Sequence, residues 1–305
     1  MLIFLARRAL LALLVTLMVL TISFMLTRLT GDLAIAIAGP QASQADVEII
    51  RKAYGLDRPL LVQFVNWVTD AAQGDLGRSF FYQENVTKLI AARLPVTLTL
   101  GLTGLTIAIC TAIPLGIIAA MREGTLLDRG IMTIAVIGQA MPSFWLGLTL
   151  VIFFGLKLQW FPISGVDTWH GYVLPGIVLS FSAIPALMRL TRSGMVDALA
   201  SDYVRTARAK GLSRSAIVLK HALRNAAMPV VAISAVQLGF MLSGSIVIET
   251  VFSLHGVGYL GWEAIGKNDF PVVQSVVLFL ATVFVILTLL ADLLNAALDP
   301  RLRTQ

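Results

Sequence analysis

The residues closest to known chemical motifs are two overlapping glycine patterns near the C-terminus. Residues 256–261 match the G-x-G-x-x-G pattern of dinucleotide-binding proteins, and residues 261–268 come close to the phosphate-binding P-loop. Both patterns require a preceding strand and a following helix in a soluble α/β domain, but here an apolar run precedes them. The P-loop pattern also ends in Asn268, where serine or threonine would hold magnesium. We therefore expect no nucleotide site and interpret the glycines as a tight turn before the last apolar run.

No other residues have the spacing of a catalytic or metal site. The three histidines, His170, His221 and His255, are far apart, and the chain contains neither H-E-x-x-H nor G-x-S-x-G. Cys110 is the only cysteine, which excludes an internal disulfide and a cysteine metal cluster. The sequence therefore predicts a non-catalytic protein that binds no metal or cofactor itself.

The most distinctive polar segment is basic and covers residues 195–225. Residues 202–210, Asp-Tyr-Val-Arg-Thr-Ala-Arg-Ala-Lys, favour a short helix, and Lys210 suits its C-terminus. Gly211 fits the left-handed position that ends a helix, and Ser213 can cap a second short helix. The segment therefore predicts a compact knob, although a basic stretch held by anionic lipid fits the same spacing.

An unusually apolar chain carries these segments. Of its 305 residues, 57% are hydrophobic and 13% are charged, whereas a soluble domain has about 25% charged residues. The composition excludes a disordered chain, and the net charge of +6 does not indicate nucleic-acid binding when charges are so sparse. Six stretches without Asp, Glu, Lys or Arg have the length of a membrane-crossing helix. They predict an all-α polytopic membrane protein, a single transmembrane domain over 1–305, with spans at about 9–27, 97–121, 130–156, 172–192, 226–248 and 271–292.

The distribution of lysine and arginine predicts the orientation of the spans. With the N-terminus in the cytoplasm, 14 of the 23 basic residues lie on the inside, which agrees with the positive-inside rule. Seven of the other nine fall in residues 28–94, a loop too long for the rule to apply. We therefore expect both termini and residues 195–225 to be cytoplasmic. The inside residues are Arg7, Arg8, Arg122, Arg129, Arg189, Arg192, Arg205, Arg208, Lys210, Arg214, Lys220, Arg224, Arg301 and Arg303.

Residues 28–94 are expected to form a helical insert on the outer, periplasmic face. Ser43 with Asp46 is a capping-box pattern, and Gly55 stops the helix that it begins. A further helix ends at the Gly-Asp-Leu-Gly run of residues 74–77. A folded cover and a docking surface for an external partner both fit this pattern.

The spans contain neutral polar residues and helix breakers but no charge near a span centre. Such residues can line a water-filled path for a polar solute, although interhelical hydrogen bonds also account for many of them. An ion-driven carrier would need buried carboxylates, and Glu249 and Asp292 lie at span ends. The driving energy is therefore expected to enter from elsewhere. The candidates for the path are Gln139, Pro142, Ser143, Gln237 and Ser243.

The basic segment resembles the coupling loop, or EAA motif, of ABC-transporter permeases. Residues 202–212, followed by 221–225 and Pro229, are similar to the form found in the dipeptide/oligopeptide/nickel branch. Arg205 stands at the glutamate position of the motif and Thr206 at its first alanine position. The motif's later alanine and glycine positions are matched.

The resemblance extends over nearly the whole chain. The departures are at residues 30–33 and 255–256, where the family often has Pro-Gly-Asp-Pro and Pro-Gly, and they leave the substrate open. The similar segments are residues 55–59 with Gln63, 74–77 with Ser79, the third-span break at 141–145, 160–162 with Gly165, 269–271 and 299–301.

The resemblance implies a type I ABC importer permease in a prokaryotic cytoplasmic (inner) membrane. It implies a second homologous permease subunit, two cytoplasmic ATPases that bind ATP and magnesium, and an external substrate-binding protein. The chain would form half of a pore that alternates its access. Di- or oligopeptides, including glutathione-like peptides, are the expected cargo. Nickel complexes, opines and sugars are alternatives, and an ion-coupled carrier is the second alternative. The implied coupling residues are Tyr203, Arg205, Thr206, Ala207, Arg208, Ala209, Lys210 and Gly211.

Overall fold

The structure, a computed structural model, describes residues 2–29, 32–39, 41–166 and 168–298. Within these residues the chain is helical, and its only strand-like feature is an isolated bridge between Arg78 and Asn85. The all-α prediction is confirmed. Residues 30–31 and 299–305, including Arg301 and Arg303, lie outside the described part. In chain order the helices are α1 (Leu2–Leu29), α2 (Leu33–Ala38), α3 (Gln44–Ala53), α4 (Leu60–Ala72), α5 (Val86–Met121), α6 (Leu126–Ala140), α7 (Ser143–Leu150), η1 (Val151–Lys157), η2 (Trp169–Tyr172), α8 (Val173–Ser180), α9 (Ile184–Ala200), α10 (Asp202–Ala209), α11 (Arg214–Ala216), η3 (Ile217–Ala222), α12 (Leu223–Val251), α13 (Val257–Gly266) and α14 (Phe270–Leu298).

Among the described residues, four helices are long and apolar enough to cross a membrane. They are Leu10–Arg28 in α1, Val86–Met121, Arg214–Val251 and Phe270–Ala296. Two bent pairs pass the same test together: α6 with α7 and η1, at 97°, and η2 and α8 with α9, at 63°. Counting each bent pair as one span gives the six spans that the sequence predicts.

A proline residue stands at each of the two bends. Proline disfavours the helical conformation of the residue before it, and Met141, which precedes Pro142, is extended at φ −71° and ψ 134°. α6 therefore stops, and α7 starts in a new direction. Pro185 occupies the first turn of α9, where its missing N–H costs nothing. The break expected at residues 141–145 is thus confirmed.

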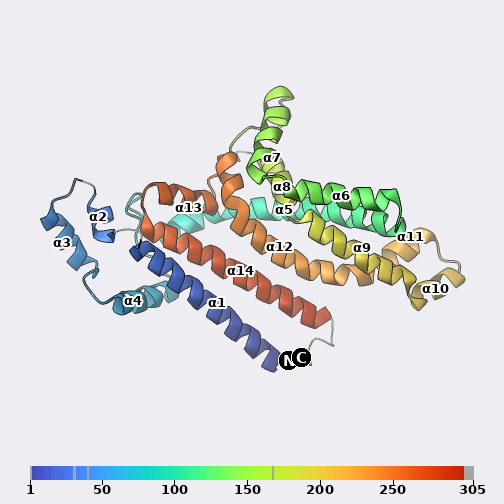
Figure 1. The fold of residues 1–305 in the computed structure, drawn as a ribbon, viewed down its shortest axis with the longest axis horizontal. Coiled ribbons are helices and arrows are strands. Elements are labelled where there is room, and N and C mark those ends of the chain that lie inside the picture. The colour runs from blue at the N-terminus through green and yellow to red at the C-terminus, as the bar shows by residue number, and fades with distance from the viewer. Residues whose placement is uncertain (1, 30–31, 40, 167, 299–305) are drawn as a thin grey trace.

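The core lies where α5, α8, α9 and α12 pack together. Leu100, Met188 and Met241 have no more than 1% of their surface exposed. α5 and α9 approach closely because Gly116 has no side chain; a Cβ there would lie 2.8 Å from Cβ of Thr191. α14 covers α12, and α1 packs antiparallel on α14 (Figure 1).

The insert lies at the end of the bundle away from α10 (Figure 1). The predicted capping box is confirmed, with Ser43 and Asp46 each accepting a hydrogen bond from the other's backbone N–H. Gly55, at φ +64°, ends this segment. The Phe24 ring of α1 meets the Phe64 ring of α4 at 5.3 Å between centroids, which attaches the insert to the first span.

Gly258 and Gly261 lie within a helix, α13 (Val257–Gly266), and Gly256 is its N-cap, so the predicted tight turn is wrong. The cause is capping by distant residues. Thr97 Oγ1 accepts from Val257 N at 2.8 Å, and the buried Glu249 carboxylate accepts from Tyr259 N at 2.7 Å. These acceptors satisfy the first N–H groups of α13. The glycines allow close packing, since a Cβ at Gly258 would lie 2.9 Å from Cα of Ile246.

Candidate functional site

α10 carries most of the predicted coupling residues and attaches to the bundle by one face. Val204 is fully buried and Ala207 is 6% exposed, and both pack against Ile217 and Leu199. The apolar contact is small but continuous along the helix. It makes α10 a fixed projection and not a free loop.

The other face of α10 is exposed and basic. Tyr203 is 42% exposed, and the remaining coupling residues other than Ala207 are exposed as well. Arg205 Nη1 donates to Asp202 Oδ1 at 3.1 Å within the same helix. Gly211 has φ +73°, the left-handed conformation that its position predicts, and no atom lies within 4 Å of a Cβ built there.

The segment after Gly211 differs from the predicted second short helix. Ser213 Oγ accepts from Ala216 N at 3.4 Å, as expected for a cap. The helix then continues through a π-helical turn into the fifth span without a break, so Pro229 lies inside α12. No glycine or proline stands between Ser213 and Pro229 to stop it. The projection is therefore continuous with a membrane-spanning helix.

A cleft of about 490 Å³ lies between α10 and the end of α5. Arg208 and Arg214 lie on its lining, while Met121, Leu199 and Val218 supply apolar surface. Guanidinium groups beside an apolar floor suit carboxylates and apolar side chains of a protein partner.

A second cavity, of about 580 Å³, brings together most of the predicted path residues. Gln139, Ser143 and Gln237 line it with Ser182, and α6, α7, the α8–α9 turn and α12 form its walls. No Asp, Glu, Lys or Arg is among its lining residues. Gln139 Nε2 donates to the Ser182 carbonyl oxygen at 3.4 Å. An uncharged cavity with several amide and hydroxyl groups suits a small polar solute.

The other two predicted path residues do not line this cavity. Ser243 is exposed on α12, about 120° around the helix from Gln237 given 3.6 residues per turn. Pro142 is exposed at the bend and sets the direction in which Ser143 enters the cavity wall.

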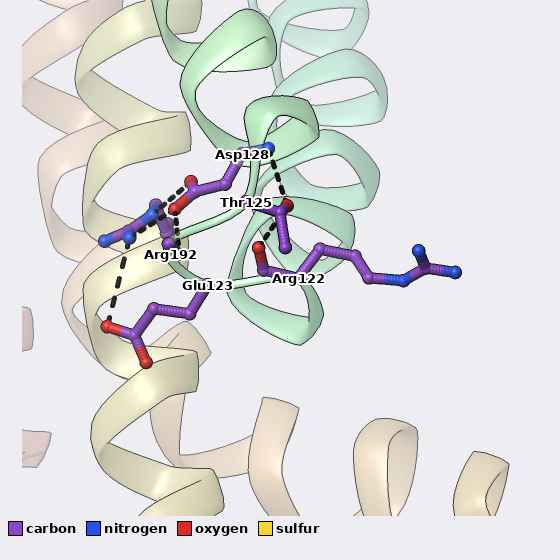
Figure 2. Close-up of polar contacts among 6 residues, drawn as sticks. Arg122, Glu123, Thr125, Asp128 and Arg192 are labelled. Atoms are coloured by element: carbon purple, nitrogen blue, oxygen red, sulfur yellow. Dashed lines mark hydrogen bonds and ion pairs between the residues drawn. The ribbon is translucent and has the colours of Figure 1, made fainter.

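The sequence analysis missed three polar clusters. On α9, Arg192 forms a two-pronged ion pair with the buried Asp128, which Figure 2 shows beside the 122–125 turn. The Thr125-x-x-Asp128 spacing is a capping pattern at the start of α6. It is a local signal for Asp128, and no such signal marks Arg192.

The second cluster joins two of the segments behind the family resemblance. The buried Asp269 carboxylate accepts from the Ser79 hydroxyl and from Phe80 N and Phe81 N, the latter two at 3.2 Å. This carboxylate ties the loop before α5 to the start of α14.

The third cluster is built around Glu249. Besides Tyr259 N, its carboxylate accepts from Thr97 Oγ1 at 2.8 Å and from Ser245 Oγ at 2.9 Å. Glu249 is fully buried and does not line the polar cavity. Its geometry is that of a structural cap.

The chain matches two family models that together cover most of its length. Residues 112–304 match the binding-protein-dependent transport system inner membrane component, and residues 1–101 match the N-terminal part of such a membrane component. The chain is 42% identical over 275 residues, 90% of each chain, to the glutathione transport system permease protein GsiC of Escherichia coli strain K12. The same identity and coverage hold for GsiC of Salmonella choleraesuis strain SC-B67.

A solved structure has the same fold. The MetNI methionine ABC transporter, in inward-facing conformations, aligns with a TM-score of 0.57 at 18% identity over 69% of this chain and 96% of that chain. The family model over residues 112–304 covers α10 and all the residues that line the polar cavity. The chain therefore belongs to the family of binding-protein-dependent transport system inner membrane components and is a multi-pass, non-catalytic permease subunit of an ABC importer.

Proposed function

We propose that this chain forms half of the translocation pathway for small peptides, with glutathione as the first cargo to test. The 42% identity to permeases named for glutathione transport supports this cargo class. The uncharged polar cavity also supports it, because amide and hydroxyl groups can exchange hydrogen bonds with a peptide backbone without holding it by charge.

α10 is proposed to be the coupling helix that docks on a cytoplasmic ATPase subunit. The observation that carries this proposal is the two-sided character of α10. Val204 and Ala207 fix one face to the bundle, and Tyr203, Arg205 and Arg208 are exposed on the other. Such a helix can transfer a displacement without absorbing it. ATP and magnesium would bind in the ATPase, not in this chain.

The proposed assembly contains this chain, a second homologous permease, two ATPases and an external binding protein. Both termini and α10 are assigned to the cytoplasm, and the insert of residues 28–94 to the outer face. The excess of basic residues at the α10 end supports this orientation. Closure of the ATPases on ATP would move α10, and the bent spans would expose the cavity alternately to the two sides.

The test is uptake of labelled glutathione by the complete complex in proteoliposomes with its binding protein. Gln237→Leu and Gln139→Leu are expected to raise the KM for transport about 2- to 10-fold, because each removes a hydrogen bond worth roughly 0.5–1.5 kcal/mol. Thr106→Val is the matched control, since Thr106 is exposed and bonds only within α5.

Competition identifies the cargo class. Unlabelled dipeptides are expected to compete with labelled glutathione. No glutathione uptake by the wild-type complex, with uptake of a nickel complex, an opine or a sugar instead, would contradict the peptide assignment.

A further inference from the structure

A buried ion pair joins the turn between α5 and α6 to α9. Asp128, in the first turn of α6, is 3% exposed. Its carboxylate oxygens accept from Arg192 Nε at 2.6 Å and from Arg192 Nη2 at 2.7 Å. Glu123 lies on the far side of the guanidinium, 3.9 Å from Nη2 (Figure 2). A two-pronged arginine–carboxylate contact fixes the orientation of two helices as well as their separation.

Hydrogen bonds within the turn between α5 and α6 fix the position of the Asp128 carboxylate independently of Arg192. Gly124 N donates to Asp128 Oδ2 at 3.0 Å, and Asp128 N donates to Thr125 Oγ1 at 3.4 Å. The carboxylate is therefore part of the cap of α6 and cannot swing away without opening the turn. A displacement of α9 at Arg192 would be passed to the whole start of α6.

The other end of α6 meets the turn that precedes α9. Gln139 Nε2 donates to the Ser182 carbonyl oxygen at 3.4 Å, and a Cβ at Gly138 would lie 2.5 Å from Cδ1 of Phe181. α6 thus contacts the α8–α9 unit at both ends. Close packing makes a hinge between them costly.

We propose that Asp128 and Arg192 form a clamp that makes α6 and α9 move as one body when α10 moves. The inference rests on the proposed docking of an ATPase on α10. Arg192 precedes the end of α9 at Ala200, next to α10, by about 12 Å of helix, and Asp128 precedes Gln139 by about 16 Å, at 1.5 Å per residue. The pair therefore lies between the coupling helix and the cavity wall. Both are positioning residues and do not touch the cargo.

The first test measures whether the clamp stays closed during the cycle. In the complete complex, Cys110→Ala removes the native cysteine, and Thr133→Cys on α6 with Ser193→Cys on α9, both exposed positions, carries a pair of spin labels while Asp128 and Arg192 stay in place. The distance between the two labels is expected to be the same in the nucleotide-free complex and in the complex trapped with ATP and vanadate, because one rigid body has one separation. A change in that distance between the two states with Asp128 and Arg192 intact would overturn the proposal, whereas Asp128→Asn is expected to allow such a change.

The second test separates transmission from folding. Asp128→Asn and Arg192→Gln are expected to lower uptake of labelled glutathione more than about tenfold, with hydrolysis of ATP retained, because the displacement no longer reaches the cavity. In the Cys110→Ala background, Asp128→Cys with Arg192→Cys is expected to lose uptake in the same way, and joining these two cysteines with a short thiol cross-linker is expected to restore it. Arg189→Gln, an exposed arginine one turn earlier on α9, is the control and should leave both activities unchanged.

Failure of the clamp is distinguishable from failure of the proposed function. If Gly211→Pro, just past the end of α10, also leaves uptake normal, the coupling role of α10 is wrong. If Gly211→Pro abolishes uptake while Asp128→Asn and Arg192→Gln keep it, only the clamp is wrong. If the wild-type complex takes up no glutathione, the peptide assignment is wrong, and the distances between the spin labels on α6 and α9 still decide the clamp.

Discussion

A graded series at Gly211 tests the role of α10 in coupling. Gly211 has φ +73°, and nothing lies within 4 Å of a Cβ added there, so substitution strains the backbone without a steric clash. A non-glycine residue in the left-handed region costs about 1–2 kcal/mol, and asparagine less. Proline cannot adopt a positive φ, and it also removes the hydrogen bond that Gly211 N donates to the Arg208 carbonyl oxygen at 3.0 Å. Its cost is about 3 kcal/mol or more.

These costs predict an ordered loss of coupled transport. A strain of about 1–2 kcal/mol lowers the population of the docked geometry about 5- to 30-fold, as 1.4 kcal/mol is tenfold in an equilibrium. Gly211→Asn is expected to keep most uptake, Gly211→Ala to lower uptake about 5- to 30-fold, and Gly211→Pro to abolish transport-coupled hydrolysis of ATP. The abundance of the chain in the membrane should stay constant. The assay is uptake of labelled cargo with ATP hydrolysis in proteoliposomes.

Gly74 supplies the matched control for this series. It has φ +83° with open space around its Cβ position, but it lies in the insert. Gly74→Ala carries the same backbone strain and is expected to leave coupling intact. Normal uptake by Gly211→Pro, or equal losses at Gly74 and Gly211, would refute the reasoning.

Three further predictions follow from buried or paired groups. Val204→Asp puts a carboxylate into the fully buried face of α10 at a cost of several kcal/mol, and it is expected to stop copurification of the ATPases while membrane insertion persists. Glu249→Gln leaves one of three buried donors unsatisfied at a cost of roughly 1–3 kcal/mol, so the melting temperature of the solubilised complex should fall; lost uptake at an unchanged melting temperature would indicate an ion-carrier role instead. The hydrogen bond from Arg51 lowers the pKa of the Asp32 carboxyl in the insert below its usual value. Because the folded pKa lies below the unfolded pKa of about 3.9, this pair stabilises the insert above that pH and the stabilisation is lost as pH falls through the folded pKa. Wild-type and Arg51→Gln complexes should therefore differ in melting temperature at neutral pH and converge in acid; a constant difference would contradict the assignment.

The features that the sequence predicts well depend on local signals. Charge-free runs mark the spans because a charge inside a bilayer is costly. The capping box at Ser43 and the left-handed Gly211 are set within four residues of chain. Three of the five path candidates meet at one cavity, because the bend at Pro142 turns Ser143 toward Gln139 and Gln237.

The features that it misses depend on contacts between distant residues. The sequence of α13 predicts a turn because the residues that cap this helix come from other helices. Thr97, which accepts from Val257 N, lies 160 residues away in the chain. The Asp128–Arg192 pair spans 64 residues, and no pattern in either segment names its partner. The two bend angles likewise follow from packing, since a proline marks where a helix breaks but does not fix its new direction.

Site-specific photocross-linking from α10 tests the central claim most directly. A photoreactive residue at position 203 or 208, on the exposed face of α10, is introduced into the chain in its native membrane, and the cross-linked partners are identified by mass spectrometry. Position 169, an exposed tryptophan site outside α10, serves as the control. We predict an ATPase subunit bound covalently at 203 and 208 and absent at 169. Recovery of no ATPase from α10, or equal recovery from position 169, would contradict the assignment of α10 as the coupling helix.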